Sequence, residues 1–147
     1  MRLRSYHPDD LLTLYNIDQA CFVPGISYTQ EELKAFIGHR RSQTWLAEEA
    51  GEITGFLIAL REPRSTLHIT TIDVLKAWRR NGVGSLLMDA AEQWARDHGL
   101  GTIELETAQN NLVAQKFYIG RGYLKVDEID HYYADGTTAW VMVKKLT

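Results

Sequence analysis

The chain has 147 residues, 45% of them hydrophobic and 24% charged, with a formal net charge of -3 at pH 7. This length and composition indicate one ordinary globular domain over residues 1–147, large enough to bury about 70% of its unfolded surface. The negative charge argues against a nucleic-acid partner, and no apolar run approaches the length of a membrane span.

Strand and helix patterns alternate along the chain without a linker or a low-complexity tract. Apolar and β-branched runs predict strands over residues 2–6, 43–49, 52–61, 69–74, 102–107, 123–130 and 138–146. Amphipathic spacing predicts helices that begin near residues 8, 29, 85 and 110 and end near residues 21, 38, 98 and 121. This order of elements predicts a mixed sheet with helices on both faces, without room for a second domain.

Local residues mark the starts of the first two helices. Pro8 and the two acids after it suit a first turn, and Thr29 with Glu32 forms a capping box. Cys21 lies on the apolar face of the first helix. We interpret this cysteine as buried packing and not as a nucleophile.

The N-terminal residues and the use of cysteine indicate a cytoplasmic protein. Residues 1–4 lead directly into polar residues, unlike a secretory signal peptide. A single cysteine cannot form an internal disulfide, which fits a reducing compartment. The five histidines show no paired ligand spacing, so no metal site is expected.

The segment from Arg79 to Gly84, with Gly82 as its first glycine, lies between an expected strand and an expected helix. Glycines let the backbone approach a ligand closely, and a helix start leaves unpaired N–H groups, so this junction suits a phosphate. It is too short for a Walker loop and lacks the third glycine of a dinucleotide fingerprint. The sequence favours a phosphorylated cofactor here, with a plain structural turn as the alternative.

A second pattern lies on the last helix. Asn111, Ala114 and Tyr118 are spaced so that they share one helical face. An amide, a small residue and a phenol in line could border a ligand channel. The alternative is a helix cap and a packed tyrosine.

Together these two patterns resemble the GNAT superfamily of acetyl-CoA-dependent N-acetyltransferases. Motif A of that family is matched by residues 69–88, and motif B is matched by residues 103–123. The resemblance spans nearly the whole chain and implies the GNAT fold, an α+β architecture. That fold has a mixed, mostly antiparallel sheet of about seven strands, splayed in the middle and covered by helices on both faces.

The resemblance implies acetyl-CoA as cosubstrate, without a metal. Amides at the helix start would bind its pyrophosphate, and the N–H of Val74 would polarise the thioester carbonyl, by family analogy. Asp73 departs from the small residue common in the family. The implied cofactor-binding residues are Ile72, Asp73, Val74, Arg79, Arg80, Asn81, Gly82, Val83, Gly84, Ser85, Asn111 and Tyr118.

Catalysis by aminolysis also needs a proton acceptor and a proton donor. Glu104 and Glu106 share one face of their strand, and Glu106 is nearer the carboxyl end, where ligands collect in open sheets. The chain is most similar to the peptide N-terminal branch, including bacterial ribosomal-protein-alanine acetyltransferases. There the base precedes the acid tyrosine by twelve residues, which implies Glu106 as base and Tyr118 as acid. An ion-paired or solvated carboxylate is the alternative for Glu106.

The same branch implies an amine acceptor at a protein or peptide N-terminus. Two segments, residues 22–28 and 131–136, resemble the loops of that branch that hold the acceptor. This resemblance implies that Tyr28, Tyr132 and Tyr133 bind the acceptor. Residues 137–138 are threonines where the family often has acids. An acidic cluster over residues 127–135 leaves open a polyamine, an aminoglycoside or a protein lysine as acceptor. A noncatalytic acyl-CoA-binding module is the alternative of another class, and the oligomeric state is not predicted.

Overall fold

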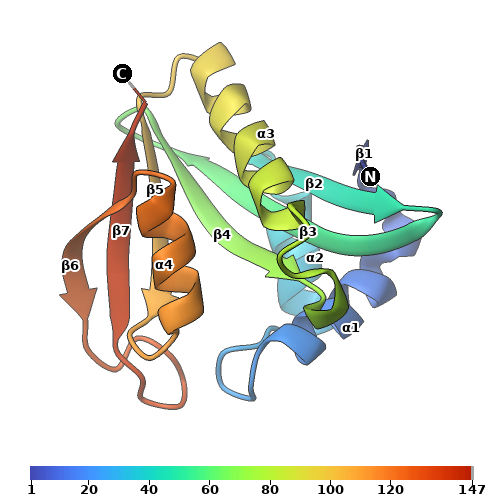
Figure 1. Cartoon of the computed structure of the whole chain (residues 1–147), viewed down its shortest axis with the longest axis horizontal. Coiled ribbons are helices and arrows are strands. Elements are labelled where there is room, and N and C mark those ends of the chain that lie inside the picture. Colours follow the sequence, from blue (N-terminus) through green and yellow to red (C-terminus); the bar gives the residue numbers. More distant parts are fainter. Residues whose placement is uncertain (147) are drawn as a thin grey trace.

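Seven strands form one mixed sheet in the order β1-β2-β3-β4-β5-β7-β6 (Figure 1). This computed structural model describes residues 1–146. β4 runs parallel to β5, and the other neighbours run antiparallel. The expected GNAT architecture is confirmed. The strands are β1 (Arg2–Ser5), β2 (Ser42–Glu49), β3 (Glu52–Glu62), β4 (Thr66–Val74), β5 (Thr102–Ala108), β6 (Leu124–Ile129) and β7 (Ala139–Lys145).

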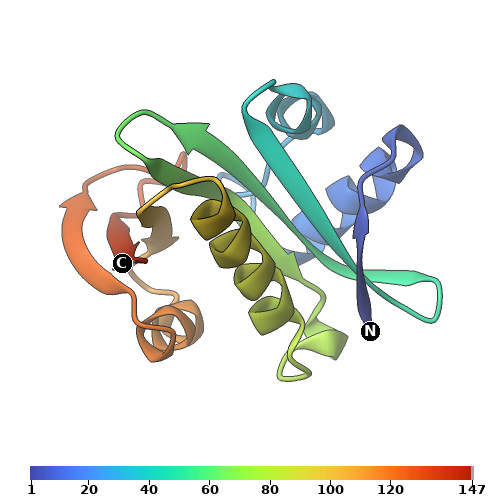
Figure 2. The same ribbon diagram turned by 90° about the horizontal axis from the view of Figure 1, so that it is seen from above.

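Helices cover both faces of the sheet. In Figures 1 and 2, α3 lies over one face, and α1 and α2 lie over the other. None of the helices within residues 1–146 is long and apolar enough to cross a membrane. The helices are η1 (Pro8–Asp10), α1 (Leu11–Cys21), α2 (Gln30–Gly38), η2 (Lys76–Trp78), α3 (Val83–Asp97) and α4 (Leu112–Gly120), where η marks a 3-10 helix.

The core consists of two apolar clusters separated by the sheet. On β3, Leu57 and Ala59 face the cluster under α3, whereas Phe56 and Ile58 face the cluster under α1 and α2. Side chains of a strand alternate between faces, so a strand covered on both sides is apolar throughout. This explains the continuous apolar run in the middle of β3.

The sheet splits between β4 and β5. Their parallel ladder has only three residue pairs, from Thr66 opposite Thr102 to His68 opposite Glu104. Beyond His68 the two strands diverge (Figure 1). The edge of β4 over residues 69–74 that faces β5 therefore has no strand partner within residues 1–146.

A bulge in β4 decides which of its side chains face which helices. Ile58 of β3 pairs with Thr71, but the next residue pairs with Ile69, so Thr70 is the extra residue. Such a slip reverses the faces of the residues that follow. Accordingly Ile69 and Ile72, three residues apart, both pack toward α3.

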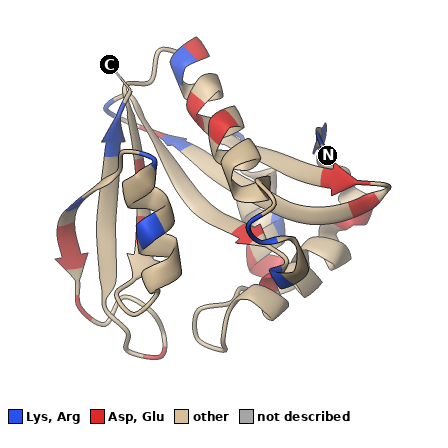
Figure 3. Cartoon of the chain, viewed as in Figure 1, with Lys and Arg blue, Asp and Glu red and all other residues tan. Residues whose placement is uncertain are grey.

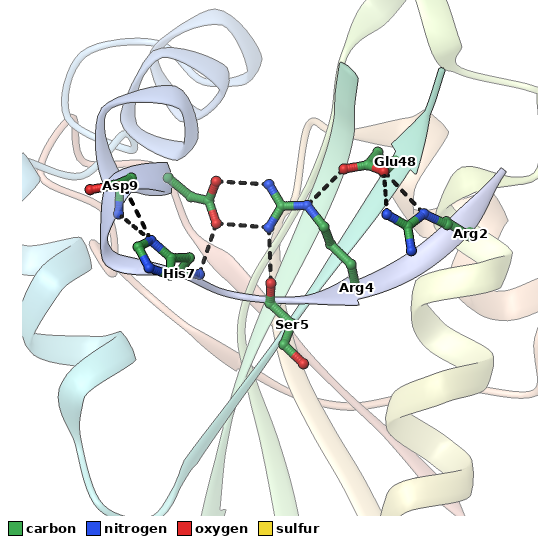
Figure 4. Close-up of polar contacts among 7 residues, drawn as sticks. Arg2, Arg4, Ser5, His7, Asp9 and Glu48 are labelled. Carbon is green, nitrogen blue, oxygen red and sulfur yellow. Dashed lines mark hydrogen bonds and ion pairs between the residues drawn. The ribbon is translucent and has the colours of Figure 1, made fainter. Parts of the chain in front are cut away.

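The start of α1 is fixed by an ion-pair cluster on β1 (Figure 4). Arg4 binds Asp10 through two hydrogen bonds of 2.8 and 2.9 Å and binds Glu48 at 2.8 Å. The hydrogen bonds from Arg4 hold the pKa of Asp10 below its usual value, although burial opposes them. The helical segment is capped by His7, whose N–H donates to Asp10, and it begins with a 3-10 turn that the sequence pattern did not indicate.

A buried carboxylate joins α3 to the C-terminal strands. Glu92 is 3% exposed. It accepts hydrogen bonds of 2.9 Å from the Tyr123 hydroxyl and the Lys144 ammonium, and Arg121 lies 3.2 Å away. These cations and the hydroxyl offset the cost of burying its charge.

Candidate active site

The segment before α3 forms an open helix N-terminus. Arg80 and Gly82 have left-handed φ angles of 65° and 81°, and the Asn81 side chain donates to the Arg79 carbonyl at 3.1 Å. Gly82 is the N-cap of α3 and supplies no side-chain cap. The first-turn N–H groups, including those of Val83, Gly84 and Ser85, therefore lack a capping side chain. Such groups together with the helix dipole attract an anion.

The structure requires glycine at the two positions of this segment for different reasons. A Cβ at Gly82 would meet no atom within 4 Å, so its left-handed φ is what requires glycine. A Cβ at Gly84 would lie 3.2 Å from Cζ of Phe117. Gly84 thus allows α3 and α4 to pack closely.

The end of β4 lies beside this helix start. The Val74 carbonyl accepts hydrogen bonds from Arg79 Nε at 3.2 Å and from Cys21 Sγ at 3.4 Å. Ile72 and Val74 are half-buried toward α3, whereas the Asp73 side chain is buried on the opposite face. Of the expected β4 contacts with a cofactor, Asp73 could therefore offer only its backbone.

These features fit a phosphorylated cofactor with an extended arm. Arg79 and Arg80 are exposed, and Figure 3 shows positive residues in the segment that leads into α3. The open N-terminus can hold the phosphates, and the unpaired edge of β4 can receive an extended chain. Burial raises the pKa of the Cys21 thiol to about 11, with the charge of Asp73 adding to the effect. This high pKa agrees with a packing role for Cys21.

On α4, the expected face has an exposed end and a buried end. Asn111 caps the helix, because its Oδ1 accepts from the Ala114 N–H at 3.1 Å. Tyr118 is 6% exposed and packs edge-on against Phe117 and Tyr123. Burial, followed by the charge of Asp73 (buried on β4), raises the pKa of Tyr118. Its phenol therefore keeps its proton at neutral pH.

Glu106 accepts hydrogen bonds from two side chains. His68 Nε2 lies 2.7 and 3.0 Å from the two carboxylate oxygens, and the Tyr132 hydroxyl donates to Oε1 at 3.0 Å. Burial lowers the pKa of His68, but the hydrogen bond and charge of Glu106 outweigh burial and raise it. Glu106 is thus part of a His–Glu–Tyr group.

Sequence reasoning did not find His68. Its strand pairs in parallel with β5, which puts His68 directly opposite Glu104 and on the same face as Glu106. Both lie on the sheet face opposite α3. The available signal was a polar residue on the expected strand 102–107 and another directly before the expected strand 69–74, but a single sequence does not show which strands are neighbours.

The two segments expected to bind the acceptor touch each other. The Ala134 N–H donates to the Gly25 carbonyl at 3.1 Å. The Tyr28 hydroxyl reaches the Thr70 carbonyl at 3.5 Å, and burial raises the pKa of Tyr28 to about 12. Tyr133 stacks edge-on against Tyr132, the tyrosine bound to Glu106. Burial and then the charge of Glu106 raise the pKa of Tyr133.

The site residues therefore fall into two groups. One group contains Glu106, His68 and the three loop tyrosines, and the other contains the open start of α3 with the end of β4. Tyr118 is buried on α4 and packs against Phe117 and Tyr123, and the charge of Asp73 at the end of β4 contributes to its raised pKa. Asn111 caps α4.

The acidic residues on β6 and in the segment after it are exposed, and Figure 3 marks them in red. Glu128 pairs with Lys125 at 2.5 Å, and Asp135 accepts from the Thr137 N–H at 2.9 Å. That hydrogen bond lowers the pKa of Asp135. Within the described residues 1–146, no group of three or more His, Cys, Asp and Glu side chains is arranged to hold a metal ion.

Comparison with known proteins decides the family. Residues 11–123 match the model of the Acetyltransferase (GNAT) family. The chain belongs to the GNAT family. This GNAT enzyme is accordingly an acetyl-CoA-dependent N-acetyltransferase.

Individual relatives include N-terminal acetyltransferases. The N-alpha-acetyltransferase of Sulfurisphaera tokodaii is 30% identical over 114 residues, covering 69% of this GNAT chain and 68% of the relative. Ard1 from Thermoplasma volcanium superposes with a TM-score of 0.86 at 27% identity, covering 99% and 97% of the two chains. The ribosomal-protein-S18-alanine N-acetyltransferase of Escherichia coli has a TM-score of 0.88 at 21% identity, covering 99% and 94%, and supports the fold.

Proposed function

We propose that this enzyme acetylates the N-terminal α-amine of a protein or peptide. The observation that carries the proposal is the Glu106 carboxylate, bound by His68 and by Tyr132 from one of two loops that touch each other. The N-alpha-acetyltransferase of Sulfurisphaera tokodaii supports this class of acceptor.

The start of α3 and the end of β4 are proposed to hold acetyl-CoA, which supplies the acetyl group. N–H groups over residues 80–85 bind its pyrophosphate, with Arg79 and Arg80 adding charge. Backbone groups of Ile72 and Val74 bind its extended arm, and the Val74 N–H is the donor to the acetyl carbonyl. Asn111, which caps α4 through Oδ1, offers its remaining amide N–H groups to the same arm.

Glu106 and His68 are proposed to receive the proton of the attacking amine. A peptide α-amine has a pKa near 7.7–8.0 and lysine one near 10.4, so deprotonating lysine at neutral pH costs about 3–4 kcal/mol more. A single carboxylate–imidazole pair suits the peptide α-amine, which is the easier of the two amines to deprotonate. His68 both orients Glu106 and shares the proton, because its Nε2 lies within hydrogen-bonding distance of both carboxylate oxygens.

Tyr118 is proposed to donate a proton to the leaving thiolate. A general acid must carry its proton at working pH. Burial and the raised pKa of Tyr118 keep the proton on its phenol until the thiolate leaves. The proton therefore passes from Tyr118 to the thiol product, while the amine proton leaves through Glu106.

Tyr28, Tyr132 and Tyr133 are proposed to contact the acceptor backbone. Hydroxyls that hydrogen-bond a peptide are left unpaired by an amine without a peptide group, which penalises polyamines. The second candidate function is acetylation of a lysine or a small cationic amine, favoured by the exposed acidic residues of 127–135. A noncatalytic acyl-CoA-binding module is disfavoured by the coexistence of Tyr118 and the Glu106 group.

A matched acceptor panel tests the proposal. The enzyme receives acetyl-CoA with one of three amines: a lysine-free peptide with a free α-amine, an N-terminally blocked peptide containing lysine, or spermidine. Mass spectrometry then locates the acetyl group. We expect transfer mainly to the first residue of the free peptide.

Two variants define the role of the loops. Tyr28→Phe should raise the KM for the peptide, whereas Tyr15→Phe, a half-buried tyrosine in the same apolar cluster, should not. Transfer mainly to lysine or spermidine would refute the N-terminal acceptor and leave the acetyltransferase activity in place.

A further inference from the structure

Two aspartates are buried together between α1 and β4. Asp18 is 0% exposed and Asp73 is 1% exposed, and neither forms an ion pair within residues 1–146. Thr71 Oγ1 donates to Asp73 Oδ1 at 2.5 Å, and the Tyr28 N–H donates to Asp18 Oδ2 at 2.7 Å. The two other oxygens, Asp18 Oδ1 and Asp73 Oδ2, receive no N–H or O–H from a described residue.

A proton shared by the two carboxyl groups would give these oxygens a partner. Two adjacent buried carboxylates without a cation cannot both be ionised at acceptable cost. Burial, followed by the hydrogen bond and the charge of Asp18, raises the pKa of Asp73 well above its usual value. Arg79, which follows the end of β4, donates to the Val74 carbonyl and not to either aspartate.

The two aspartates lie on the two elements that carry the two parts of the active site, α1 with the following loop and β4. Asp18 fixes the backbone of Tyr28, the residue that ends the first acceptor segment. Asp73 directly precedes Val74, at the strand end proposed to hold acetyl-CoA. A weaker contact, from Cys21 Sγ to the Val74 carbonyl, runs parallel to it from the same helix.

We propose that Asp18 and Asp73 share one proton and act as positioning residues that hold the Tyr28 loop against β4 for acceptor binding. The positioning role rests on the proposed function, whereas the shared proton does not. Neither carboxyl contacts the acceptor, because both are covered. Their effect therefore falls on the acceptor KM through Tyr28 and its loop.

Infrared spectroscopy tests the shared proton directly. A difference spectrum of wild type minus Asp73→Asn at neutral pH should contain the carbonyl band of a protonated carboxyl. The amide of Asp73→Asn supplies a permanent N–H to Asp18 while keeping one negative charge in the pair. A spectrum without that band overturns the shared proton.

Steady-state kinetics tests the positioning. Asp73→Ala should raise the acceptor KM about 10-fold while changing kcat and the KM for acetyl-CoA much less, because it removes the buried hydrogen bond. Asp73→Asn should restore the acceptor KM. Thr71→Val removes only the donor to Asp73 and should give a smaller rise, which keeps the test decisive if Asp73→Ala does not fold.

Asp10→Asn is the matched control, since it removes an ion-paired carboxylate at the start of the same helical segment. It should leave the acceptor KM unchanged. An unchanged acceptor KM in both Asp73→Ala and Thr71→Val, or equal losses in Asp73→Ala and Asp73→Asn, overturns the positioning role. Should lysine or spermidine prove to be the acceptor, the proposed function fails, and the infrared test still decides the shared proton.

Discussion

Gly82→Ala should weaken acetyl-CoA binding, whereas Gly99→Ala should not. The two glycines flank opposite ends of α3, with φ angles of 81° and 72°, and an added Cβ meets no atom within 4 Å at either position. A left-handed alanine costs about 1–2 kcal/mol, so both variants should lose a similar free energy of unfolding. Backbone strain is thereby matched between them.

The difference in acetyl-CoA affinity between the two variants reports the effect on ligand binding alone, because the loss of stability is the same in both. At Gly82 the new methyl group projects from the segment whose N–H groups are proposed to bind phosphate. Displacing one hydrogen bond to a charged phosphate costs about 1.5–3 kcal/mol, or about 10- to 100-fold in Kd. Calorimetric titration measures the Kd, and urea denaturation measures the shared loss of stability. Equal acetyl-CoA affinities of the two folded variants would refute the assignment of the phosphate site.

Three further variants test the acid, the base and the buried carboxylate of α3. Tyr118→Phe should lower kcat about 10²–10⁴-fold with little change in acetyl-CoA affinity. Glu106→Gln should lower kcat and move the ascending limb of the pH profile to lower pH, because Glu106 is what raises the pKa of His68 against its burial. Tyr123→Phe leaves one oxygen of Glu92 without its hydroxyl donor and should lower the free energy of unfolding by about 1–3 kcal/mol in urea denaturation.

The raised pKa of His68 also makes the free energy of unfolding depend on pH. Because the pKa of His68 is raised on folding, its pairing with Glu106 stabilises the fold fully below about pH 6.5, and this contribution is lost as pH rises through the folded pKa. Wild type and Glu106→Gln should therefore differ more in free energy of unfolding at pH 6 than at pH 9. A constant difference over this range would contradict the protonated pairing, and near-normal turnover of both Tyr118→Phe and Glu106→Gln would contradict their catalytic roles.

The elements that follow from local signals were predictable from the sequence. The capping box of α2 forms as expected, with Thr29 Oγ1 accepting from the Glu32 N–H and Glu32 accepting from the Thr29 N–H. Asn111 caps α4, which sequence reasoning had kept as an alternative to a ligand role. These features depend on residues three positions apart, so a single sequence contains the information needed.

The pairing of distant elements was not predictable. His68 meets Glu106 because β4 and β5 are parallel neighbours, and Asp18 and Asp73 are buried on the same side of the sheet because α1 packs on β4. The bulge at Thr70 adds a second obstacle, since it changes the alternation within β4. A strict two-residue period from His68 would place Asp73 on the α3 face, opposite to its position in the fold.

Because the β4–β5 ladder is short, the proposed proton acceptor also links the two strands beyond the end of their ladder. His68 is the last β4 residue of that ladder, and its imidazole binds Glu106 on β5 just past the divergence. The His68–Glu106 pair thus connects the two parts of the sheet at the point where β4 and β5 diverge. The same pair is proposed to gain a proton in each catalytic cycle. Protonation of the imidazole would make its hydrogen bond to Glu106 charge-assisted and therefore stronger, and release of the proton to solvent would weaken it again. Under the proposed mechanism, the strength of this link between the two halves of the sheet would therefore change with the protonation of the site during turnover.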